Sequence, residues 1–266
     1  MKNIEYRQKR KLTPWRKVSL ASWKPTGDSS TYVMEDIEMD EVKIYCKANN
    51  INVNSFIIKA LSNTIEKHPK INSTVRFWKI RERNDISIFF HTSKDSATDD
   101  LSGILINDGQ KKSIFDVSKE YLEKIELFKS GVSELDQSKK IVGILPGIFS
   151  KPLMNLYSFI VYSLNLNLRI FKAPNNAFGS IMLTSIGSLG LSKALCPIAP
   201  YTRVPMVISF GKIEKRPIVI ENELTIRDIC TFGFTFDHRI IDGIHFSDFL
   251  TCFKAYLTQP YILENE

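Results

Sequence analysis

The chain has 266 residues, of which 43% are hydrophobic and 24% charged, and its formal net charge is +7. These values are typical of a globular protein with one large domain or two small ones. The four cysteines lie far apart without a CxxC pair, and no two of the four histidines have metalloprotease spacing. We therefore expect no disulfide framework and no metal, as in a protein of the reducing cytoplasm.

Part of the positive charge lies in a basic N-terminal arm, residues 1–12. The arm lacks the apolar core of a secretory signal. No recognition motif accompanies the charge, so we expect no nucleic-acid partner. A solvated tail and a field that attracts a phosphorylated small molecule both remain open.

The first half of the chain alternates between strand and helix patterns. Thr13 and Pro14 suit the start of a helix, and the apolar spacing of residues 53–65 predicts a helix that ends before Pro69. Alternation and β-branched residues predict strands at 31–40, 71–79, 86–91 and 103–106, with a polar turn at 81–85.

In the second half, Ser113 and Asp116 resemble a capping box that opens a helix reaching Phe128. Residues 179–190 predict a strand that runs into a glycine-rich turn. Further strands are expected at 204–211 and 223–236, followed by a helix at 244–257. Strands outnumber helices without strict alternation, which favours an α+β fold with a mixed sheet.

Residues 141–171 form an apolar segment with prolines at 146 and 152. Within it, residues 153–170 are about long enough to span a membrane, but asparagines, serines and an arginine interrupt them, and polar groups are costly inside a bilayer. A buried or interface helix is the favoured interpretation. A lid over an acyl chain and a helix on a membrane surface are the alternatives.

His238 lies where the strand at 223–236 ends, and Asp242 and Gly243 precede the last helix. A histidine at a strand end is a candidate general base, although a purely structural histidine is the alternative. Thr184 or Ser185 offers a hydroxyl at the end of another strand. A base and a hydroxyl without a metal suit group transfer through a tetrahedral intermediate. Either hydroxyl could instead be a nucleophile, but neither lies in a Gly-x-Ser-x-Gly elbow.

These residues also carry a family resemblance. Asp237-His-Arg-Ile-Ile-Asp-Gly243 resembles the DHRxxDG signature of the catalytic domain of dihydrolipoamide acyltransferases. Chloramphenicol acetyltransferase shares the HxxxDG pattern and the fold. Residues 179–190 are similar to the family's GTFTISNLGxxG strand, and residues 56–72 to its FIIKA…HPxLN helix. The chain is thus identified as a member over residues 12–129 and 178–260.

The resemblance implies a chloramphenicol acetyltransferase-like fold, with a mixed central sheet flanked by helices, and a homotrimer with active sites between subunits. It implies that His238 takes a proton from an acceptor thiol or hydroxyl, which attacks an acyl-CoA thioester directly. Thr184, with Ser185 as the fallback, would then hydrogen-bond the oxyanion. Acyl-CoA, in particular acetyl-CoA, would be a co-substrate and not a bound cofactor.

The remaining residues that the resemblance implies serve support and binding. Asp242 would be a structural aspartate paired with Arg16. The other implied residues are Asp237 and Gly243 as structural support, and Gly187, Ser188 and Gly190 at the substrate.

The predicted organisation is an arm at 1–12, one catalytic domain at 13–260 with an apolar insertion at about 130–178, and a tail at 261–266. We find no lipoyl domain in the sequence. These features favour a stand-alone, cytoplasmic, CoA-dependent acyltransferase that acts on a small-molecule or carrier-protein-bound acceptor, for example in natural-product tailoring. The alternatives are the core of a 2-oxoacid dehydrogenase complex whose lipoyl domain is on another chain, and a non-catalytic trimeric binding protein. We expect no membrane partner.

Overall fold

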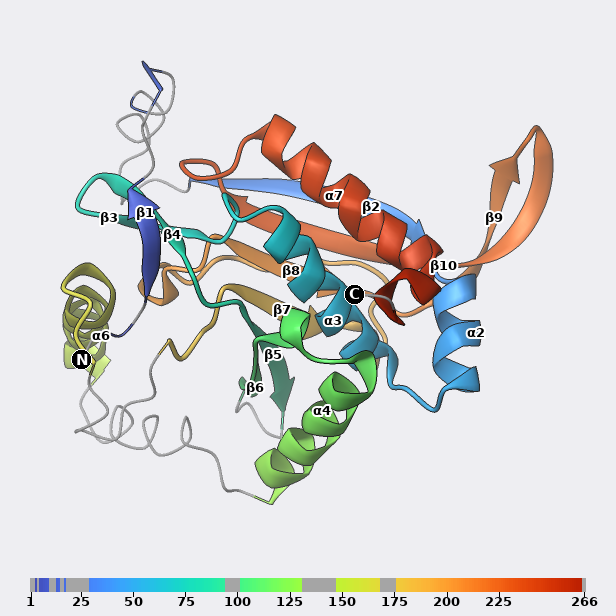
Figure 1. The fold of residues 1–266 in the computed structure, drawn as a ribbon, viewed down its shortest axis with the longest axis horizontal. Helices are drawn as coiled ribbons and strands as arrows, with labels where there is room; N and C mark the ends of the chain where they lie inside the picture. The colour runs from blue at the N-terminus through green and yellow to red at the C-terminus, as the bar shows by residue number, and fades with distance from the viewer. Residues whose placement is uncertain are drawn as a thin grey trace.

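The computed structural model describes residues 3, 5–9, 13, 14, 17, 29–93, 101–130, 147–167 and 176–264. A seven-stranded sheet in the order β2-β10-β8-β7-β5-β6, with β9 paired to β10, is its largest unit (Figure 1). Its strands are β2 (Ser30–Glu38), β5 (Ser87–Ser93), β6 (Leu101–Asn107), β7 (Ile181–Ser185), β8 (Met206–Phe210), β9 (Glu214–Ile220) and β10 (Glu223–Asp237).

The sheet is mixed. The pairs β5–β7 and β7–β8 are parallel, whereas the pairs β10–β2, β10–β8, β10–β9 and β5–β6 are antiparallel. Together with the helices, this arrangement confirms the predicted α+β class. The long strand β10 is central to it, because it pairs with three other strands and ends one residue before His238.

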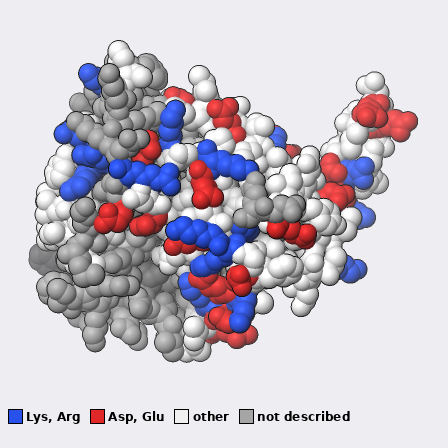
Figure 2. All heavy atoms as spheres, in the orientation of Figure 1, with Lys and Arg blue, Asp and Glu red and all other residues white. Residues whose placement is uncertain are grey.

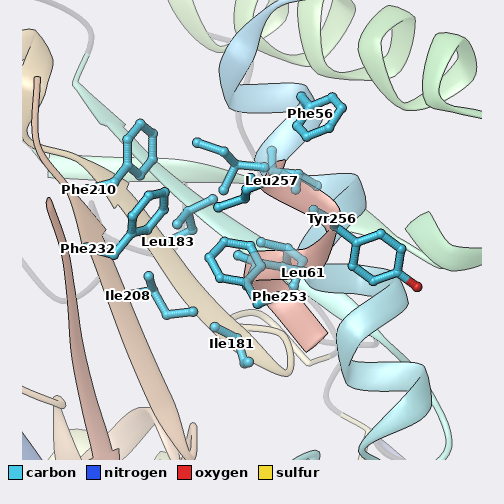
Figure 3. Close-up of a cluster of buried hydrophobic side chains, with 14 of the residues drawn as sticks. Phe56, Leu61, Ile181, Leu183, Ile208, Phe210, Phe232, Phe253, Tyr256 and Leu257 are labelled. Atoms are coloured by element: carbon cyan, nitrogen blue, oxygen red, sulfur yellow. The ribbon is translucent and has the colours of Figure 1, made fainter. Parts of the chain in front are cut away.

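The main hydrophobic core lies between one face of this sheet and the helices. The helices are α2 (Asp40–Ala48), α3 (Val53–Lys67), α4 (Ile114–Lys129) and α7 (Gly243–Thr258), with 3-10 turns η1 (Gly109–Lys111) and η6 (Pro260–Glu264). Ile181 and Leu183 of β7 point into this core, and Phe253 of α7 stacks edge-on against Phe232 of β10 (Figure 3). Met182, between the two β7 residues, belongs to a second cluster on the opposite face.

The predicted helices at 53–65, from 113 onward and at 244–257 are all present as α3, α4 and α7. Ser113 caps α4 by accepting a hydrogen bond from the Asp116 backbone N–H at 3.1 Å, as the capping-box pattern predicts. Two other elements were not predicted. The strand expected at 31–40 ends at Glu38 and α2 begins at Asp40, and β9 forms a ribbon with the outer part of β10.

A small sheet in the order β1-β4-β3 corrects the strand and turn predicted for residues 71–85. Its strands are β1 (Tyr6–Lys9), β3 (Ser73–Arg76) and β4 (Lys79–Arg83). The turn lies at Phe77 and Trp78, which both have left-handed backbones with φ of 46° and 60°. Most of residues 81–85, which were predicted as a polar turn, belong to strand β4. The prediction failed because two large aromatic residues are atypical of a left-handed turn.

The apolar segment predicted as a helix is described from residue 147 to 167. It contains α6 (Gly147–Ser158), with Pro152 inside it, followed by the π-helical turn η2 (Phe159–Ser163). Among the described residues no helix is long and apolar enough to cross a membrane. Val161 and Tyr162 of η2 are buried, whereas several leucines of the segment are exposed.

Candidate active site

His238 follows directly on the last residue of β10, as predicted. Its backbone N–H donates to the Ser29 carbonyl at 2.9 Å, which ties the strand end to the start of β2. Its Nδ1 lies 3.0 Å from the Ile241 carbonyl oxygen. Because a carbonyl can only accept, this contact requires the proton on Nδ1. The other ring nitrogen, Nε2, is then the unprotonated atom that can act as a base.

The neighbours of His238 in sequence form a partly buried ion pair. Arg239 donates to Asp237 through its backbone N–H at 3.0 Å and through its guanidinium, with Nη2 at 2.6 Å from Oδ2. The Ser29 hydroxyl donates to the same carboxylate at 3.1 Å. The hydrogen bonds to Asp237 raise the pKa of Arg239, so the pair holds the turn around His238 in one charged arrangement. The support role expected for Asp237 stays a prediction.

A second arginine lies beside this pair. Arg203 follows the 3-10 turn η5 (Pro200–Thr202), has a left-handed φ of 56°, and donates from Nε to the Ser158 hydroxyl of α6 at 3.1 Å. Burial lowers the pKa of Arg203, and so does the nearby charge of Arg239. Arg203 therefore lies near the Asp237–Arg239 pair. No sequence pattern indicated Arg203, which lies 35 positions before His238 and belongs to no motif.

Asp242 is the N-cap of α7. Its side chain accepts from the His245 backbone N–H at 3.2 Å and lies 2.7 Å from His245 Nδ1. Asp242 therefore caps α7 and contacts His245, a partner that was not predicted, and its structural role in the site stays a prediction. The spacing of three residues at a helix start could have indicated it. Arg16, the expected partner, lies outside the described residues.

Gly243 is the first residue of α7. Neither its backbone conformation nor the space around it within the chain requires a glycine at this position. A Cβ atom built on it meets no atom within 4 Å, and its φ is not in the left-handed region. A glycine here therefore leaves open space beside the Asp242 cap.

Thr184 and Ser185 end β7, as predicted, but Thr184 lies far from His238 in the same chain. Thr184 is in register with Ser209 of β8, and Ser209 with Gly233 of β10. Five residues along β10 and two strand spacings separate Thr184 from His238, which gives about 19 Å between their backbones. Since β7 and β10 run antiparallel, the two residues lie toward opposite ends of the sheet. One protomer alone therefore does not bring base and hydroxyl together.

The turn after β7 is a 3-10 turn, η4 (Gly187–Leu189), packed on the end of β8. A Cβ on Gly187 would lie 2.7 Å from the Gly211 carbonyl oxygen, so only glycine allows this approach. Ser188 donates its hydroxyl to the Ser185 carbonyl at 2.8 Å, and Gly190 has a left-handed φ of 79°. These three residues shape the backbone next to Thr184, and a role in binding substrate stays a prediction.

The described residues contain no cluster of three or more histidine, cysteine or acidic side chains able to hold a metal. What the strand ends offer is a histidine whose Nδ1 contacts a carbonyl, an ion pair in the same turn, and hydroxyls at a second location. This set suits proton transfer and the stabilisation of a negatively charged oxygen.

Comparison with known proteins agrees with this description. A model of the 2-oxoacid dehydrogenases acyltransferase (catalytic domain) family matches residues 29–140 and 172–264. The dihydrolipoyllysine-residue acetyltransferase component of the pyruvate dehydrogenase complex of Mycoplasma capricolum is 25% identical over 246 residues, covering 90% of this chain. The chain spans less than half of the curated relatives it matches over most of its length: 46% of that protein and 42% of its Rickettsia felis counterpart.

The fold is shared with solved structures of the same kind. Azotobacter vinelandii dihydrolipoamide acetyltransferase superposes with a TM-score of 0.66 at 14% identity, over 88% of this chain and 83% of that one. A chloramphenicol acetyltransferase superposes with a TM-score of 0.52 at 12% identity, over 94% and 100%. The motifs, the sheet order and the family match agree. The chain belongs to the acyltransferase catalytic-domain family of the 2-oxoacid dehydrogenases.

Proposed function

We propose that the chain transfers an acyl group between coenzyme A and a thiol or hydroxyl acceptor, at sites formed between two copies of itself. The observation that carries the proposal is the fixed tautomer of His238 at the end of β10. A second copy would supply the hydroxyl that lies out of reach in the same chain. A trimer, as the resemblance implies, satisfies this requirement with three equivalent sites.

In the proposed reaction the acceptor X–H gives its proton to His238 Nε2 while X attacks the thioester carbonyl carbon. The carbonyl oxygen becomes an oxyanion, to which the Thr184 hydroxyl donates a hydrogen bond. The intermediate collapses, the C–S bond breaks, and the leaving thiolate takes the proton back from His238. Each bond and proton is accounted for without a covalent acyl-enzyme. The Ile241 carbonyl keeps Nδ1 protonated throughout, so Nε2 alone exchanges the proton.

For the acceptor, the relatives support a dihydrolipoyl thiol, because their names describe dihydrolipoyllysine-residue acetyltransferases of pyruvate dehydrogenase complexes. We therefore rank a catalytic core of a 2-oxoacid dehydrogenase complex above the stand-alone enzyme that the sequence favoured. The second candidate is a stand-alone acyltransferase that acts on a small-molecule or carrier-protein-bound acceptor. Its support is the segment at 141–171, which falls between the two matched parts of the family model and places α6 beside Arg203.

An acceptor assay separates the two candidates. The full chain is incubated with acetyl-CoA and either dihydrolipoamide or a panel of small alcohols, and the release of free CoA is followed. The first candidate predicts CoA release with dihydrolipoamide that disappears in the His238→Ala variant. Release with an alcohol alone supports the second. No release with any thiol or hydroxyl acceptor, from a folded protein, would contradict both.

A further inference from the structure

The segment at 147–167 and the β3–β4 turn expose large apolar side chains next to each other. Both lie at the left edge of Figure 1, where α6 stands below β3 and β4. We call the six residues that share this property the apolar patch: Phe77 (54% exposed), Trp78 (68%), Leu156 (54%), Phe159 (45%), Leu164 (40%) and Leu166 (49%). Exposed apolar clusters of this kind mark interaction surfaces more often than chance.

Specific contacts hold the two parts of the patch together. The rings of Phe77 and Phe159 meet edge to face with 6.4 Å between centroids. Arg76 lies over the Phe77 ring at 5.6 Å and donates from Nε to the Ser163 carbonyl and from Nη2 to the Leu164 carbonyl. Arg76 therefore satisfies two carbonyls at the end of η2 while its stem stays on the aromatic surface.

The backbone of the turn directs both aromatic residues outward at an energetic cost. Left-handed φ is unfavourable for a residue with a side chain, and Phe77 and Trp78 both adopt it. The neighbouring Ile80 is fully buried, so the same hairpin also contributes to the interior. A tight turn that places phenylalanine and tryptophan at its tip suits insertion into an amphipathic environment.

The surroundings of the patch are positively charged. The β3–β4 hairpin contains Arg76, exposed Lys79 and half-exposed Arg81, against one half-exposed acidic residue, Glu82. Lysines and arginines gather at the upper left of Figure 2, over the position of β3 and β4 in Figure 1.

We propose that the apolar patch binds the surface of an anionic lipid bilayer, with Phe77 and Trp78 inserted among the headgroups. Apolar and aromatic side chains bordered by lysine and arginine complement such a surface, because anionic headgroups attract each nearby positive side chain. The contact is peripheral, because no described helix could cross the membrane. This departs from the expectation, made from sequence, that the chain has no membrane partner. It is independent of the acyl-transfer proposal.

Flotation of the full chain with lipid vesicles tests the proposal. The chain floats with vesicles of equal parts phosphatidylcholine and phosphatidylglycerol, does not float with phosphatidylcholine alone, and is released by salt. The double variant Phe77→Ser/Trp78→Ser lowers the bound fraction at least about tenfold. Lys79→Glu also weakens binding while leaving both aromatic residues in place. Leu127→Ser on α4, which removes an equally exposed side chain away from the patch, leaves binding unchanged.

Three results would overturn the proposal. The first is a wild-type chain that does not float with the anionic vesicles. The second is equal binding by the wild type and the Phe77→Ser/Trp78→Ser variant, with both folded by melting. The third is a loss of oligomer mass on ultracentrifugation of that variant, which would show that a second copy covers the patch. Trp78 adds a direct readout: its emission shifts to the blue on vesicle binding, and Trp78→Phe removes that shift without removing binding.

Discussion

The imidazole of His238 is oriented by contacts within its own turn, and the Asp237–Arg239 ion pair braces that turn. We predict that His238→Ala lowers the rate of acyl transfer at least ~100-fold, the usual contribution of a positioned base. The measurement is CoA release, with thermal unfolding as the control for folding. A loss smaller than about tenfold in a folded variant would remove His238 from the role of base.

The Thr184 hydroxyl carries the second residue-scale prediction. Thr184→Ala should lower kcat on the order of 10- to 1000-fold, because one donor to the oxyanion is lost. Thr184→Ser keeps the hydroxyl and should retain most of the rate, and Ser185→Ala is the matched control one position later. If Thr184→Val is silent and Ser185→Ala is not, the hydroxyl that donates is that of Ser185.

At this scale the sequence predicted where the candidate residues lie, but not how they are held. The positions of His238, Thr184 and Asp242 follow from strand and helix patterns and from the family motif. The contact of Nδ1 with the Ile241 carbonyl depends on the rotamer of one side chain in a turn, which no pattern encodes. Arg203 comes near Arg239 only through the fold, because η5 and the turn after β10 are distant in sequence.

Among the elements, α7 depends on its Asp242 cap. We predict that Asp242→Ala lowers the free energy of unfolding by about 1 kcal/mol, with a range of about 0.5–2, because the backbone N–H of His245 loses its acceptor. Asp242→Asn should lose much less, since asparagine caps a helix about as well as aspartate. Chemical denaturation measures both. Equal stability of the alanine variant and the wild type would contradict the capping role.

The turn η4 depends on close approach to the end of β8. Gly187→Ala should destabilise the fold, because the added methyl lies 2.7 Å from both the Gly211 carbonyl oxygen and the Lys212 nitrogen. Gly243→Ala is the matched control, since nothing lies within 4 Å of a Cβ there. We expect a lower melting temperature for the first variant only. If Gly243→Ala leaves stability intact but lowers activity, the glycine keeps space for substrate or for another copy.

The sequence patterns located the helices and strands in which apolar residues recur at a regular helical or strand spacing. The helices α4 and α7 each bury one face, and their apolar spacing located them. The apolar spacing located α3 as well, although that helix is buried on all sides between Ser55 and Ile65. The pattern failed at Phe77 and Trp78, where aromatic residues that favour strands occupy a turn held by Arg76. It also missed β9, whose exposed Val219 pairs with exposed Leu224 on β10, because a ribbon outside the core has no buried face to reveal it.

For the whole molecule, the order of motifs was enough to predict the family and the mixed sheet, since both belong to the parts that match the family model. The segment at 147–167 was predicted as a buried or interface helix, but its exposed patch and its contact with Arg203 arise from tertiary structure. A site shared between copies, which the family resemblance implies, stays a proposal. Its support is the register of β7, β8 and β10, which separates Thr184 from His238 by about 19 Å.

Complementation between two inactive variants tests this shared site most directly. His238→Ala and Thr184→Ala chains are produced together, so that mixed oligomers form, and CoA release is compared with each variant alone. If each site takes its histidine from one copy and its hydroxyl from the next, about one quarter of the sites in an equal mixture are complete. The mixture should then recover about one quarter of the wild-type rate, which is above the rate of either parent. A mixture no more active than its parents, with mixed oligomers verified, would contradict a site formed between copies.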